Sequence, residues 1–174
     1  MNLLQFVLLL FFLPSLTLAQ DVAVPVDDET GLITYQEVVT EEGDKASFFN
    51  RCIRWMNEYY SNPVDVTKTR DPESGVVKGL HRIRLKNTLD DGTQTDAGTV
   101  QYSFVLEFKD GRYRYTLSEF ELRQASKIPC EKWLNSTDPQ SKSYLKQLDD
   151  FAQSWIASLK EGMMPEPEKK ADDW

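Results

Sequence analysis

Histidine and cysteine are scarce in this sequence, which has one histidine, His81, and two cysteines, Cys52 and Cys130. A structural zinc site usually has four protein ligands, so we expect no metal and no cofactor. Ser-His-Asp or Cys-His hydrolysis needs a histidine beside a nucleophile and an orienting acid. Because His81 falls on the apolar side of a predicted strand, we interpret it as an ordinary strand residue.

Catalytic signatures are absent too: the sequence contains no GxSxG, HExxH, Walker or GxGxxG pattern. Aspartate and glutamate are plentiful, which leaves a paired-carboxylate site open, although nothing singles out one pair. We therefore predict that the protein is not an enzyme.

Positive charge is in deficit, with 20 lysines and arginines against 28 aspartates and glutamates, a net charge of −8. Proteins hold nucleic acid by neutralising its phosphates with lysine and arginine. An acidic domain repels a phosphate backbone, so we expect no nucleic-acid partner.

Long apolar runs are missing except at the start of the chain. The run from Leu3 to Leu18 is almost wholly apolar. It leads into Thr17-Leu18-Ala19, a small-residue pattern typical of a signal-peptide cleavage site. A single membrane anchor is the alternative, but the run is shorter than the ~20 residues needed to span a bilayer and contains Pro14. We predict a signal peptide at residues 1–19, no transmembrane segment in the mature chain, no lipoprotein cysteine, and a secreted or periplasmic protein.

The two cysteines have two interpretations in an oxidising compartment. A disulfide between Cys52 and Cys130 would close a long loop and stabilise the fold by roughly 4 kcal/mol. Alternatively, Cys52 is a small buried residue on the apolar face of a helix. The sequence leaves both open.

The firmest structural prediction is a β-hairpin over residues 98–122 that turns at Asp110-Gly111. An Asp-Gly pair between two alternating apolar runs favours a type I′ turn and places Phe108 opposite Tyr113. The alternation slips by one residue near Ser118-Glu119, which predicts a β-bulge there. A bulge bends its strand, so we expect a curved sheet.

The remaining periodicity predicts three further strands and two helices. The strands are Leu32–Val39, Val64–Thr69 and Val76–Asn87, and the helices are Lys45–Tyr60 and Ser141–Glu161. Residues 88–97 are predicted to be a polar loop and residues 123–137 an irregular stretch. We expect residues 20–29 to be a leader, residues 30–162 a single domain, and residues 163–174 a disordered acidic, proline-rich tail.

This order, β-α-β-β-β-β-α, predicts an α+β fold. Four of the five strands are consecutive, so their sheet is antiparallel and one face is available for helices to cover. The long last helix carries the wide apolar stripe that a concave sheet face requires.

The sequence also resembles a known family. The resemblance rests on the Thr30-Gly31-Leu32-Ile33 strand, the Phe48/Trp55 helix, and the hairpin with Val100–Phe108 and Lys109-Asp110-Gly111-Arg112-Tyr113. These segments look like a bacterial secreted family of unknown function with a TATA-binding-protein-like (TBP-like) fold. The resemblance implies a fold and a compartment but no functional residues, since fold does not imply function.

Two binding hypotheses follow. The first is a non-enzymatic module that binds a small apolar molecule at an open end of the core, with candidate aromatics Tyr35, Tyr59, Tyr102, Tyr113, Tyr115 and Trp133. The second is a protein-interaction or envelope-structural role for a basic strip formed by Lys78, Arg82, Arg84, Arg112 and Arg114. The alternative to the strip is a solvated sheet face that discourages aggregation.

Overall fold

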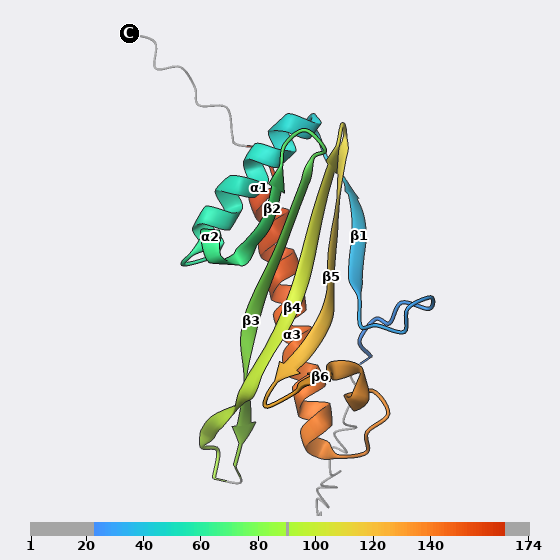
Figure 1. The fold of residues 1–174 in the computed structure, drawn as a ribbon, viewed down its shortest axis with the longest axis vertical. Coiled ribbons are helices and arrows are strands. Elements are labelled where there is room, and N and C mark those ends of the chain that lie inside the picture. Colours follow the sequence, from blue (N-terminus) through green and yellow to red (C-terminus); the bar gives the residue numbers. More distant parts are fainter. Residues whose placement is uncertain (1–22, 90, 166–174) are drawn as a thin grey trace, which may run out of the picture.

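The computed structural model describes residues 23–89 and 91–165. They form an α+β domain in which two long helices lie against one face of a six-stranded antiparallel sheet (Figure 1). The elements are β1 (Tyr35–Thr40), α1 (Lys45–Tyr59), α2 (Pro63–Val66), β2 (Thr67–Asp71), β3 (Val76–Thr88), β4 (Gln94–Lys109), β5 (Arg112–Arg123), β6 (Lys127–Pro129), the 3-10 turn η1 (Cys130–Trp133) and α3 (Pro139–Gly162).

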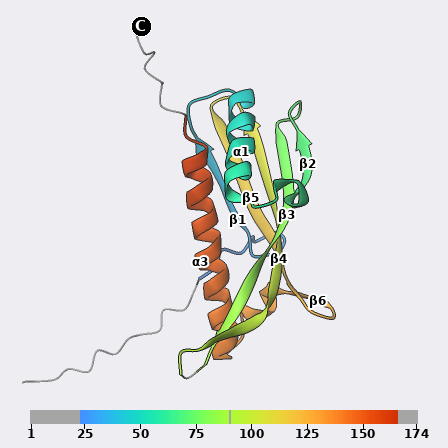
Figure 2. The ribbon, with the colours of Figure 1, turned by 90° about the vertical axis from the view of Figure 1, so that its left-hand side faces the viewer.

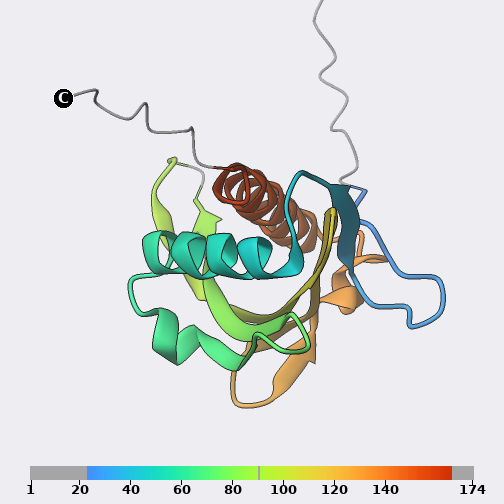
Figure 3. The ribbon, with the colours of Figure 1, turned by 90° about the horizontal axis from the view of Figure 1, so that it is seen from above.

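The sheet has the order β1-β5-β4-β3-β2, and β6 also pairs with β5. One edge of β5 pairs with β4, and the other edge is shared by β1 along residues 112–117 and by β6 along residues 121–123. Seen from above, the sheet curves around α1 and α3 (Figure 3). The predicted curved antiparallel sheet with a long C-terminal helix is confirmed.

The hairpin register is confirmed as well. Lys109 pairs with Arg112, and Phe108 pairs with Tyr113, so Asp110 and Gly111 form the two-residue turn. The predicted turn type is wrong, however: Gly111 has a φ of 73°, but Asp110 does not have a positive φ, and a type I′ turn requires positive φ at both central residues.

The predicted bulge is confirmed at Glu119. Gln101 and Ser103 are two residues apart on β4, but their partners on β5, Glu121 and Ser118, are three residues apart. The extra residue, Glu119, has a φ of 57°, and its carboxylate accepts a hydrogen bond from the Ser103 hydroxyl. The bulge separates the stretch of β5 that pairs with β1 from the stretch that pairs with β6.

Each long helix begins directly after an aspartate that caps its N-terminus, and α3 starts two residues before the predicted Ser141. Asp44 accepts a hydrogen bond from the Ser47 backbone N–H (2.7 Å) at the start of α1, and Asp138 accepts one from the Ser141 N–H (3.1 Å) at the start of α3. Pro139 occupies the first turn of α3, where it has no N–H to satisfy.

Helix α3 runs along the whole sheet (Figure 2). At one edge, the Tyr35 hydroxyl donates to Asp149 (2.9 Å). Further along, the Gln147 side chain bonds both the backbone N–H and the C=O of Lys86 (2.9 Å each). These contacts fix α3 to β1 and β3, with its apolar side chains buried against the sheet between them.

Two predicted strands need correction at their N-terminal ends. Within the predicted strand 64–69, Pro63–Val66 form the short helix α2, because proline is pre-set for a first helical turn, and β2 begins only at Thr67. In the first strand, Ile33 pairs with Val26 of the predicted leader, so β1 starts at Tyr35.

The predicted polar loop is shorter than expected. β4 begins at Gln94, so most of residues 94–97 belong to the sheet, with an irregularity between the Leu85–Gly98 and Lys86–Asp96 pairs. Strand pairing is made by backbone groups, and polar side chains do not prevent it.

The domain extends beyond its predicted limits. Val24 of the predicted leader and Met163 of the predicted tail are buried, and part of the irregular stretch 123–137 forms β6 and η1. The predicted signal peptide lies outside the described residues, as do residues 166–174.

Candidate functional site

A hollow of about 450 Å³ lies where α1 ends against β3. Helix α1 stops at Tyr59, and Tyr60 takes an extended conformation (φ −101°, ψ 131°) that directs its ring into the core, where it is 3% exposed. We call this space the His81 hollow; its lining residues are Tyr59, Tyr60, Ser61, Asn62, Asp65, Val66 and His81.

The Tyr60 side chain is held from several sides. Its hydroxyl accepts a hydrogen bond from the Trp155 indole N–H of α3 (2.8 Å). Its ring stacks on Phe104, with centroids 6.0 Å apart and planes 9° apart, and meets the edge of His81 at 4.9 Å. Tyr60 is therefore a fixed wall that joins α1, α3 and the sheet.

Two buried polar atoms beneath this hollow lack partners. His81 and Tyr102 are paired residues of β3 and β4, with ring centroids 6.1 Å apart. Among the side chains of residues 23–89 and 91–165, the buried atoms without a hydrogen bond are Nδ1 of His81 and the hydroxyl oxygen of Tyr102. An unsatisfied buried polar group costs about 1–3 kcal/mol, so this pair is an energetically unfavourable feature of the core.

Burial governs the ionisation of both groups. It lowers the pKa of His81, and the neighbouring Arg82 charge lowers it further, so the imidazole is neutral at pH 7. Burial raises the pKa of Tyr102 far above its usual range, so this side chain is a neutral phenol. Both side chains are therefore uncharged at neutral pH.

A second hollow, of about 740 Å³, lies on the other side of Tyr59, between the C-terminal ends of α1 and α3. The Trp55 ring stacks on Tyr59 (5.2 Å, 27°), and its N–H donates to Ser158 (3.0 Å). Tyr59 is thus a wall shared by two adjoining hollows, of which the second is lined by Arg54, Trp55, Glu58, Tyr59, Ser158, Glu161, Gly162, Met164 and Pro165.

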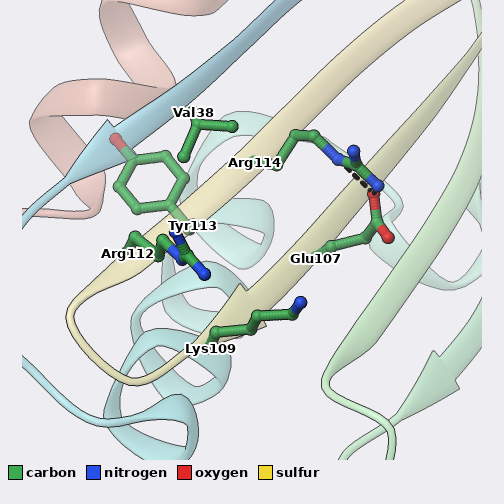
Figure 4. Close-up of a pocket in the computed structure, with 6 residues that line it drawn as sticks. All are labelled: Val38, Glu107, Lys109, Arg112, Tyr113 and Arg114. Carbon is green, nitrogen blue, oxygen red and sulfur yellow. Dashed lines mark hydrogen bonds and ion pairs between the residues drawn. The ribbon is translucent and has the colours of Figure 1, made fainter.

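A third, smaller hollow of about 230 Å³ lies at the hairpin end of the sheet (Figure 4). Val38 is 54% exposed there, and Lys109, Arg112 and Arg114 line the same hollow. The Arg114 guanidinium is bound to Glu107 (Nε to Oε2 2.7 Å). Among the residues that line this third hollow, only Tyr113 is aromatic. The third hollow therefore suits an apolar ligand less well than the His81 hollow does.

Most of the aromatic candidates from the sequence belong to the core. Tyr35, Tyr102, Tyr113, Tyr115 and Trp133 are all at most 9% exposed. Of the six candidates, Tyr59 lines the first two hollows and Tyr113 lines the third. Sequence reasoning did not include Tyr60 or His81 among the ligand-binding candidates, although the helix break at Ser61-Asn62-Pro63 marked where α1 would end.

The five cations of the predicted basic strip share one face but fall into separate groups. Lys78, Arg82 and Arg84 lie on β3, and Arg112 and Arg114 lie on β5, all exposed. Arg114 pairs with Glu107 of β4, and Glu107 pairs with Val76 of β3. Arg84 lies eight residues beyond Val76 on β3, so it is about 26 Å from the level of Arg114. The structure therefore does not bring all five together.

The cysteines form no disulfide: Cys52 and Cys130 are free, buried thiols. Burial raises the pKa of Cys52 and, with Glu131 beside it, raises the pKa of Cys130 to about 12. The sequence left open either a disulfide or a buried thiol, and the structure agrees with the buried thiol.

Residues 23–89 and 91–165 contain neither a cluster of metal-binding side chains nor a membrane-spanning helix. No group of three or more histidine, cysteine, aspartate or glutamate side chains is placed to hold a metal ion. No helix in these ranges has the length and apolar character to cross a membrane.

The chain is similar to proteins of known structure. Residues 35–123 match the model of a family described as a domain of unknown function (DUF4468) with a TBP-like fold. A TBP-like protein from Parabacteroides distasonis is 16% identical, with a TM-score of 0.65 over 80% of this chain and 96% of that one. A DUF4468 family protein from Bacteroides ovatus is 16% identical, with a TM-score of 0.66 over 84% of this chain and 93% of that one. No curated protein matches the chain.

Proposed function

The chain belongs to the DUF4468 family, and on this premise we propose that it is a secreted or periplasmic, non-enzymatic module that binds a small, largely apolar molecule in the His81 hollow. The apolar run at residues 3–18 supports export. The family and its fold carry no activity with them, so the proposal rests on the site itself.

The observation that carries the proposal is the unpartnered His81 beside two tyrosine walls. Small-molecule sites are mostly apolar and aromatic hollows of roughly 300–1,000 Å³ with a few polar groups that orient the ligand. The His81 hollow, at about 450 Å³, fits this description. The His81 imidazole is part of the lining, and its Nδ1 has no hydrogen-bond partner among the described residues.

The contacts of the hollow favour binding over catalysis. Its acid, Asp65, accepts a hydrogen bond from the Asn62 amide (2.5 Å), whereas general acid–base work needs an acid that orients the histidine. The neutral imidazole and the Tyr59 and Tyr60 rings suit a planar apolar body with one hydrogen-bonding group.

The proposal is tested with the fluorescent probe 1-anilinonaphthalene-8-sulfonate. Trp55 and Trp155 both lie beside the wall of the hollow, so bound probe accepts energy from tryptophan. We expect saturable binding to the natural protein, and a loss of at least about fivefold in affinity for Tyr59→Ala and His81→Ala, because truncating an important contact residue costs more than about 1 kcal/mol.

The matched control is Tyr144→Ala, a half-buried α3 tyrosine that contacts Trp133 instead. It should bind the probe as the natural protein does. Equal affinity of the probe for all four proteins contradicts the proposed site. Probe binding that is seen only in variants with a lowered unfolding temperature, and not in the natural protein, contradicts it as well.

A further inference from the structure

The face of the sheet that the helices leave uncovered, called the open face here, carries a row of cations. Arg84, Thr99, Arg123 and Lys127 are successive partners across β3, β4, β5 and β6. Paired residues point to the same side of a sheet, and this side is opposite the buried Leu85, Val100 and Leu122. Arg82 lies two residues before Arg84 on β3 and points to the same side. We call Arg82, Arg84, Arg123 and Lys127 the arginine row.

The three arginines of this row are available to a partner. All three are exposed, and none of their side chains forms a hydrogen bond or ion pair within the described part of the chain. The fourth member, Lys127, is bound to Glu121 (3.0 Å) on the same face. Among the described residues, the row therefore presents three guanidinium groups without an ion pair, on a protein whose net charge is −8.

The spacing of these groups matches an extended polypeptide. Residues two apart on a strand are separated by about 7 Å, and residues two strands apart by about 10 Å. Arg82 and Arg84 thus repeat at the distance between alternate side chains of an extended chain. Guanidinium groups bind carboxylates in bidentate fashion, which fixes geometry as well as charge.

We propose that the arginine row docks an extended acidic segment of a partner protein that carries carboxylates on alternate residues. Charge complementarity identifies the partner, and the acidic remainder of the chain orients it toward this face. Glu121 lies within the row, and Asp96 lies at its lower edge opposite Lys86. These carboxylates disfavour a continuous polyphosphate more than a segment with separate acidic side chains.

This surface is separate from the His81 hollow, because His81 and Arg82 are adjacent strand residues on opposite faces of the sheet. The interaction therefore neither depends on the proposed ligand nor fails with it. It also replaces the predicted five-residue strip by a compact set that includes two residues absent from that prediction, Arg123 and Lys127.

The test measures fluorescence anisotropy of a fluorescein-labelled peptide of alternating glutamate and threonine. A second peptide has the same composition, with its glutamates in one block. We expect the alternating peptide to bind more tightly than the block peptide. The double variant Arg84→Glu/Arg123→Glu should weaken alternating-peptide binding by at least about tenfold, while Arg112→Glu, an exposed arginine at the far end of the same face, should change it less than about twofold.

Oligothymidine and vesicles containing phosphatidylglycerol are measured in parallel. Tighter binding of either than of the alternating peptide overturns the proposal, as does equal loss of peptide binding in the double variant and in Arg112→Glu. Absence of alternating-peptide binding to the natural protein at low ionic strength also overturns it. All three substituted positions are exposed, so we expect each variant to unfold at the same temperature as the natural protein. A thermal unfolding measurement checks that each variant is folded.

Discussion

The ring of Phe104 occupies the space that a β-carbon at Gly79, its partner on the neighbouring strand, would take. The same ring is linked to the His81 hollow, because Phe104 stacks on Tyr60 and Tyr60 contacts His81. Gly79 therefore sets the position of Tyr60 through Phe104. Its φ is not in the left-handed region, so it is the close approach and not the backbone conformation that requires glycine here.

Gly79→Ala should destabilise the fold by about 1–3 kcal/mol, the range for overpacking a core. The new methyl group would collide with the Phe104 ring, which packs between the sheet and α3. Urea unfolding measures the free energy of unfolding, and the double variant Gly79→Ala/Phe104→Leu is the control. Since leucine lacks the obstructing ring, the double variant should lose less than the sum of the two single variants; strict additivity contradicts the contact.

Tyr60→Phe should cost about 1–3 kcal/mol, because it leaves the buried Trp155 N–H without its acceptor. Tyr59→Phe is the matched control on the adjacent residue, whose half-buried hydroxyl has no hydrogen bond within the described residues. It should change stability by less than about 0.5 kcal/mol. Comparable urea midpoints for the two variants would show that the Tyr60–Trp155 bond does not stabilise the fold.

Tyr102→Phe should have the opposite sign. The Tyr102 hydroxyl is buried and unpartnered, so its removal relieves a desolvation cost, and the free energy of unfolding should stay the same or rise by up to about 1 kcal/mol. Differential scanning calorimetry of the two proteins at the same pH checks this. A loss of stability greater than about 1 kcal/mol would mean that the hydroxyl is hydrogen-bonded in solution.

Stability should depend on pH through His81. Burial, and then Arg82, lower the pKa of His81 in the folded protein below its ordinary 6.5, so the unfolded chain takes up a proton first as the pH falls. The contribution of His81 to the free energy of unfolding is fully present above pH 6.5. It decreases as the pH falls from 6.5 toward the pKa of His81 in the folded protein. His81→Gln should flatten the curve in this window, as measured by urea unfolding at successive pH values. An unchanged slope in the variant contradicts the lowered pKa.

Local chemistry was sufficient to predict the sheet's centre. The Asp110-Gly111 turn fixes the pairing of β4 with β5, and the slip of apolar residues near Glu119 marks the bulge, since both signals lie within a few residues of sequence. The short elements were harder. Pro63–Val66 alternates like a strand but begins with a proline that is compatible with a helix. In β6, Ile128 alone gives no strand pattern, and its place in the sheet is evident only from its pairing with Leu122 of β5.

The candidate site was predicted only in part. Tyr59 was one of the six aromatic candidates for lining an open end of the core, but the other five proved to be buried core residues. The importance of His81 depends on an unpaired nitrogen, which is a property of its three-dimensional surroundings. The arginine row depends likewise on register, because Arg84 and Arg123 become neighbours only through the β4 and β5 pairing across the bulge.

The most direct test of the central claim is an NMR titration of the 15N-labelled protein with indole, a planar apolar molecule with one hydrogen-bond donor. The account predicts saturable chemical-shift changes centred on Tyr59, Tyr60, Asn62 and His81, the residues around the hollow, and their loss in Tyr59→Ala. Shifts centred instead on the hollow at Val38 and Arg112, or no saturable shifts at all, would contradict it.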